Sequence, residues 1–105
     1  MAFVRVAKVA DVPPGSIHQI DAGGRPLALA NVGGTFRAID GTCLHRGGPL
    51  GEGTLEGTVV TCPWHGWQFD VVTGKNALNP AAVVACLAVE VRGDEVFVEI
   101  RSVAR

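Results

Sequence analysis

The chain has 105 residues, 48% of them hydrophobic, and a formal net charge of −1, which together indicate one small globular domain over residues 1–105. Its 9 lysine and arginine residues are scattered along the chain, which excludes an extended cationic surface for nucleic acid. No apolar run reaches the roughly 18 residues of a membrane-spanning helix, and the N-terminus lacks the apolar core of a secretion signal, so we expect a cytoplasmic protein.

Short runs in which apolar and polar residues alternate predict β-strands along most of the chain. The expected strands span residues 3–9, 16–20, 27–32, 35–39, 58–61, 67–71, 87–91 and 95–100. Glycines between these runs predict tight turns at residues 22–25, 33–34, 56–57, 73–75 and 92–95. Strands about every ten residues, joined by such turns, favour an all-β fold, either a sandwich or a small barrel.

The stretch over residues 76–86 has the weakest pattern in the chain. Pro80 argues against a long helix there, because proline removes a backbone donor and clashes with the preceding turn. We therefore predict a loop that leads into a strand. Cys86 lies in an apolar run over residues 83–89, and we expect it to be a buried small hydrophobic residue.

Two short motifs carry the chemistry of the chain. Cys43-Leu44-His45 is followed after sixteen residues by Cys62-Pro63-Trp64-His65, and both motifs lie in stretches rich in glycine and proline. One thiolate and one imidazole from each of two loops is the pattern of a Rieske [2Fe-2S] site, in which one iron takes two sulfurs and the other takes two nitrogens.

The same four side chains allow one alternative metal. Zinc also binds two cysteines and two histidines, but zinc fingers place the cysteine pair and the histidine pair on separate short elements. Here each loop supplies one cysteine and one histidine. The spacing therefore favours the iron–sulfur cluster and leaves zinc as the lesser alternative.

The runs over residues 43–50 and 62–70 resemble the Rieske family, and the whole chain is similar to the small Rieske ferredoxins of bacterial aromatic-ring dioxygenase systems. The resemblance implies a Rieske-type antiparallel β-sandwich. It also implies a small cluster-binding subdomain, over residues 41 to about 76, inserted in the basal sandwich.

The resemblance further implies the role of each ligand. Cys43 and Cys62 are expected to bind the inner iron, and His45 and His65 the outer iron, of one [2Fe-2S] cluster per chain. A third loop containing Asn79 and Pro80 is expected to shield the cluster from water, as in the family.

The chain lacks what a Rieske oxygenase needs for catalysis, so we expect an electron carrier with no catalytic residue. An oxygenase has a second iron site made of two histidines and a carboxylate, but only His18 remains here, in a predicted strand where we expect it at the surface. By resemblance, a flavin-containing reductase supplies single electrons and a terminal oxygenase accepts them. The carrier is expected to be a monomer.

Residues beside the ligands are expected to tune the cluster. Gly47, Gly48 and Gly66 are expected to turn backbone N–H groups toward the cluster sulfurs. The high-potential members of the family join the two ligand loops by a disulfide, and a serine and a tyrosine donate hydrogen bonds to the sulfurs. The matching residues here are Gly48, Trp64, Trp67 and Phe69, so we predict a potential near the lower end of the Rieske range of about −150 to +300 mV.

Leu44, Pro49 and Trp64 flank the ligands and predict an apolar edge for transient docking of redox partners. Two other functions remain open at this point. One is a small Rieske subunit of a nitrite reductase-like system, and the other is a Rieske protein that serves a different monooxygenase.

Overall fold

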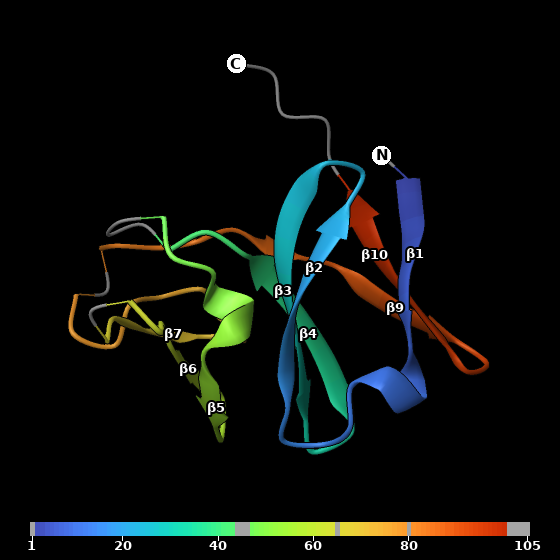
Figure 1. The fold of residues 1–105 in the computed structure, drawn as a ribbon, viewed down its shortest axis with the longest axis horizontal. Helices are drawn as coiled ribbons and strands as arrows, with labels where there is room; N and C mark the ends of the chain where they lie inside the picture. The colour runs from blue at the N-terminus through green and yellow to red at the C-terminus, as the bar shows by residue number, and fades with distance from the viewer. Residues whose placement is uncertain (1, 44–46, 65, 80, 101–105) are drawn as a thin grey trace.

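The computed structural model describes residues 2–43, 47–64, 66–79 and 81–100, and its regular structure consists of ten strands and two short 3₁₀ helices (Figure 1). An outer sheet has the order β1 (Ala2–Lys8), β10 (Glu95–Ile100), β9 (Val89–Arg92). A central sheet has the order β2 (Ile17–Ala22), β3 (Arg25–Val32), β4 (Thr35–Asp40), β8 (Cys86–Leu87). A small sheet has the order β5 (Thr54–Glu56), β6 (Val59–Thr61), β7 (Gln68–Asp70).

All strand pairs are antiparallel, so the expected all-β sandwich class is confirmed. The central sheet stands between the outer sheet and the small sheet, as Figure 1 shows. The two 3₁₀ helices are η1 (Val9–Asp11) and η2 (Leu50–Glu52). None of the described residues forms a helix long and apolar enough to cross a membrane.

The tight turns are made by glycines in the left-handed backbone region. Gly23 and Gly24 join β2 to β3 with φ angles of 63° and 88°, and Gly33 and Gly34 join β3 to β4 with φ angles of 58° and 99°. Residues with a Cβ rarely adopt these angles, and such angles match the twist of a hairpin. The predicted turns between these strands are therefore confirmed.

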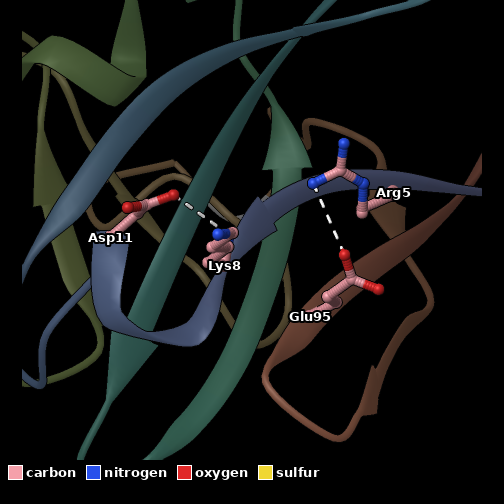
Figure 2. Close-up of polar contacts among 4 residues, drawn as sticks. All are labelled: Arg5, Lys8, Asp11 and Glu95. Carbon is pink, nitrogen blue, oxygen red and sulfur yellow. Dashed lines mark hydrogen bonds and ion pairs between the residues drawn. The ribbon is translucent and has the colours of Figure 1, made fainter.

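Two polar contacts involve β1 and the turn that follows it. Arg5 on β1 forms an ion pair with Glu95 on β10 at 3.5 Å, and the backbone N–H of Lys8 donates to Oδ2 of Asp11 at 3.1 Å, which fixes the turn into η1 (Figure 2). The side chains of the ion pair are 55% and 38% exposed, so it contributes little to stability.

Strand β3 divides the interior into two hydrophobic cores, because both of its faces are buried. Leu27 and Leu29 point into the core between the central and outer sheets. Ala28 and Ala30 point into the core between the central and small sheets. Side chains alternate along a strand, so the large residues face one core and the small residues face the other.

Three details differ from the expectations from sequence. Strand β5 contains a single apolar residue, Leu55, and therefore has no alternation to detect. The strand expected over residues 87–91 is divided: β8 pairs with β4, and β9 pairs with β10 in another sheet.

The third difference concerns Cys86, which is exposed rather than buried. Its neighbour Leu87 packs against the core between the central and outer sheets, so alternation turns the thiol to the other face. There it contacts the carbonyl oxygen of Val72 at 3.7 Å. Partial burial, together with the charge of Asp70, raises the pKa of the Cys86 thiol.

Candidate metal centre

The two cysteines of the motifs lie side by side in the core between the central and small sheets. Cys43 follows the end of β4 and Cys62 follows the end of β6. Each is only 2% exposed, and their thiols are close enough to hydrogen-bond. Buried neighbouring sulfurs from two loops are what one iron with two thiolate ligands requires.

The first ligand loop, residues 43–48, is closed by its own backbone. The N–H of Cys43 donates to the carbonyl of Gly48 at 2.8 Å, and the N–H of Gly47 donates to the carbonyl of Cys43 at 2.9 Å. Gly47 has a φ of 73°, which this tight turn requires. The Gly47 amide is therefore directed at the loop backbone, whereas the sequence suggested a sulfur as its acceptor.

The second ligand loop, residues 62–67, is closed in the same way. The N–H of Cys62 donates to the carbonyl of Trp67 at 2.7 Å, and Gly66 has a φ of 75°. The backbone N–H of Trp64 donates to the sulfur of Cys62. A donor aimed at sulfur stabilises the thiolate form that binds metal.

Burial dominates the electrostatics of Cys62. It raises the pKa of the Cys62 thiol, the hydrogen bond from the Trp64 backbone opposes that shift, and the nearby Cys43 raises the pKa again. Two thiolates this close repel each other in a site of low dielectric. A positive metal between the sulfurs removes this repulsion, so the donor set fits a cationic iron centre.

The two histidines of the motifs, His45 and His65, lie outside the described residues, as does Leu44 of the expected docking edge. Among the residues that the structure does describe, no group of three or more His, Cys, Asp or Glu side chains gathers to hold a metal ion. His18 is exposed on β2, as expected. Of the four predicted ligands, the structure therefore describes the two cysteines.

A comparison with protein families matches residues 2–96 to the Rieske [2Fe-2S] domain. The chain belongs to the Rieske family. This Rieske protein is 41% identical over 98 residues to the ferredoxin CarAc of Metapseudomonas resinovorans, with 91% of this chain and 92% of that protein covered. It is 38% identical over 101 residues to the ferredoxin component of biphenyl 2,3-dioxygenase from Rhodococcus jostii, with 95% and 94% covered.

Among solved structures, the Rieske protein matches a chain from a complex of reduced oxygenase and oxidised ferredoxin in carbazole 1,9a-dioxygenase. The TM-score is 0.82 at 41% identity, and 91% of each chain is covered. These relatives confirm the Rieske fold, the Rieske-type [2Fe-2S] cluster and the role of a ferredoxin, an electron carrier. The zinc alternative is excluded by the same match.

The Rieske protein also uses a support that the sequence did not reveal. The Gln19 side chain on β2 donates to the carbonyl of Gly41 at 3.0 Å and accepts from the N–H of Gly51 at 2.7 Å. These bonds fasten both ends of the segment that contains the first ligand loop to the central sheet. No local pattern distinguishes Gln19, because its partners are 22 and 32 residues away.

A second support is Asn76, which organises the segment over residues 76–82. Its Oδ1 accepts from the N–H groups of Leu78 and Asn79, both at 2.9 Å, and its own N–H donates to the carbonyl of Ala82 at 2.8 Å. A cavity of about 400 Å³ separates this segment from the second ligand loop, and it is lined by Gly66, Trp67, Gln68, Asn76, Leu78 and Asn79. The expected third loop thus lies beside the second ligand loop, with Pro80 outside the described residues.

Proposed function

We propose that this Rieske ferredoxin takes single electrons from a flavin-containing reductase and passes them to a terminal Rieske oxygenase of an aromatic-ring dioxygenase system. The observation that carries the proposal is the pair of adjacent, buried sulfurs of Cys43 and Cys62. The ferredoxin relatives support the carrier role, and the carbazole dioxygenase complex supports an oxygenase as acceptor.

The proposed ligands are Cys43 and Cys62 on the inner iron and His45 and His65 on the outer iron. When bound, the cluster supplies reversible uptake of one electron. The chain keeps the cysteine sulfurs out of water, fixes both loops by backbone hydrogen bonds and directs the Trp64 N–H at the sulfur of Cys62. No residue is assigned a catalytic role.

The proposed organisation is a single domain over residues 1–105, with the cluster-binding subdomain over residues 41 to about 76. The small sheet and both cysteines fall within that segment, which supports the division. We further infer a monomeric, cytoplasmic carrier, since a shuttle needs small interfaces and fast release. The expected potential is near the lower end of the range of about −150 to +300 mV, because Trp67 and Phe69 replace the expected serine and tyrosine donors.

The proposed docking edge includes exposed apolar side chains near the second ligand loop. Trp64 is 49% exposed and Leu78 is 95% exposed, although each is a large hydrophobic residue. Apolar residues exposed close to a redox centre suit a transient interface, where part of the contact is dry and the area is small. Replacing Leu78 with Ser is expected to raise the KM of the oxygenase for the ferredoxin without changing the spectrum of the cluster.

The ligand assignment is tested by spectroscopy on the purified protein. Cys43→Ser and Cys62→Ser are each expected to abolish the visible absorption and the EPR signal of the reduced cluster. Cys86→Ser is the matched control, because this third cysteine is exposed and lies in another part of the fold. An intact Rieske spectrum in either ligand variant contradicts the assignment.

The carrier role is tested by reconstitution with a flavin-containing reductase and an aromatic-ring dioxygenase. Product formation is expected to depend on added ferredoxin and to be lost with the Cys62→Ser variant. Turnover at an undiminished rate without the ferredoxin contradicts the role. Reduction of the cluster by the reductase, followed by no oxidation by the oxygenase, contradicts the proposed acceptor.

A further inference from the structure

Gly48 and Trp64 lie against each other where the two ligand loops meet. A Cβ placed on Gly48 would lie 2.9 Å from Sγ of Cys62 and 3.0 Å from two ring carbons of Trp64. Such distances are shorter than carbon tolerates, so the backbone of the first loop packs directly on the sulfur and the indole of the second loop. Glycine is required here for close approach, since Gly48 has no left-handed φ to explain it.

Trp64 acts on the same sulfur in two ways. Its backbone N–H donates to the sulfur of Cys62, and its ring covers the buried Gly48 that touches that sulfur. The indole remains 49% exposed, so it stands between solvent and the loop junction. Cys62 itself is 2% exposed.

We propose that Trp64 and Gly48 form a noncovalent clamp that holds the two ligand loops together and keeps water from the Cys62 side of the cluster. The proposal rests on the proposed role of Cys62 as a ligand. Trp64 is a positioning residue in this account, because it acts through the sulfur of Cys62 rather than on iron.

The clamp has a measurable consequence for the lifetime of the cluster. If the ring and the glycine hold the loops closed, loosening them opens a path for water and chelator to the thiolates. Residues that support metal ligands typically contribute about 10–100-fold to metal affinity. We therefore expect at least a tenfold faster release of iron to a chelator when either half of the clamp is changed.

The first test is Gly48→Ala, which inserts one methyl group between the loops. Gly57→Ala is the control for backbone strain, since Gly57 lies in the β5–β6 turn at a φ of 61°, where alanine is disfavoured although its Cβ meets nothing within 4 Å. Iron release from the isolated holoprotein to a chelator is followed by absorbance. Release about tenfold faster in Gly48→Ala than in Gly57→Ala supports the clamp, and equal rates overturn it.

The second test keeps the backbone and changes only the ring, in case Gly48→Ala does not fold. Trp64→Ala is expected to speed iron release and to raise the midpoint potential, because water near the sulfur stabilises the more negative reduced cluster. Trp64→Phe restores an aromatic cover and is expected to restore most of both properties. A wild-type potential and release rate in Trp64→Ala overturn the clamp.

A failure of the clamp can be distinguished from a failure of the ligand assignment. These measurements use the isolated ferredoxin, so they do not depend on a reductase or an oxygenase. If Cys62→Ser keeps its cluster, the ligand assignment is wrong and the clamp is wrong with it. If Cys62→Ser loses its cluster while the Gly48 and Trp64 variants release iron at the control rate, the clamp alone is wrong.

Discussion

The two ligand loops have the same internal hydrogen-bond pattern but are attached to different parts of the fold. In each, the cysteine N–H donates to the carbonyl five residues later, Gly48 in the first loop and Trp67 in the second. The first loop is fastened to the central sheet through Gln19 on β2. The second loop leads from β6 to β7 of the small sheet. The local bonds shape each loop, while their relative position depends on how two sheets pack.

That packing is the core that contains both cysteines. Cys43 and Cys62 belong to the same buried cluster as Phe69 of the small sheet and Ala28 of the central sheet. A change in this core therefore acts on the distance between the two sulfurs even when it touches neither loop. We therefore expect a change in the shared core to lower the free energy of unfolding more than a change in the support of either loop.

The largest effect is expected from Phe69→Ala. Phe69 is fully buried between the sheets, and its ring centroid is 6.4 Å from that of Trp67 in the second loop. Removing a buried phenylalanine costs about 3–5 kcal/mol. Denaturant unfolding of the holoprotein, followed by loss of cluster absorbance, measures this cost, and a loss below about 1 kcal/mol contradicts the role of the shared core.

Gln19→Ala is expected to have the next largest effect, and to act on the first loop. It removes two partly buried hydrogen bonds and leaves the N–H of Gly51 without this acceptor, at a cost of about 1–3 kcal/mol. Gln68→Ala is a matched control, because its hydrogen bond to Thr61 is exposed. Hydrogen exchange is expected to increase in residues 47–51 and not in residues 66–70, and the reverse pattern would reject the assignment of Gln19 to the first loop.

Asn76→Ala is expected to have an effect no larger than that of Gln19→Ala, and a more local one. The side chain of Asn76 accepts two backbone hydrogen bonds from the segment beside the second loop. Each such bond contributes about 0.5–1.5 kcal/mol to the free energy of unfolding. Faster amide exchange at Leu78 and Asn79 is the expected signature. Asn79→Ala serves as the comparison, because its side chain accepts one exposed hydrogen bond from Ala81; equal exchange in the two variants counts against a special role of Asn76.

Arg5→Gln is expected to have the smallest effect on stability, because its ion pair lies far from both loops. The ion pair with Glu95 is exposed at both ends, so its loss is expected to cost at most about 1 kcal/mol and less at high salt. The cluster potential should not move. A clear shift in that potential would show that the outer sheet is coupled to the loops more strongly than the two-core architecture implies.

The sequence predicted the parts of this molecule that depend on local pattern. Alternation located the long strands, the glycines located the turns, and the two motifs located the cysteines in two loops. Residues whose role depends on distant partners had no such signal. Gln19 reads as an ordinary strand residue until residues 41 and 51 are brought to it. Cys86 is exposed because its neighbour Leu87 packs on the core between the central and outer sheets, which turns the thiol to the other face of β8.

The burial of both faces of β3 has a consequence for how the protein unfolds. Leu27 to Ala30 are buried on both faces, and β3 is paired with β2 on one side and β4 on the other, so we expect their amides to be among the last to exchange with water. The core that contains the two cysteines and the core under the outer sheet therefore share β3 as a common wall. Heating should melt them in one cooperative step, and the slowest-exchanging amides of the chain should report that step.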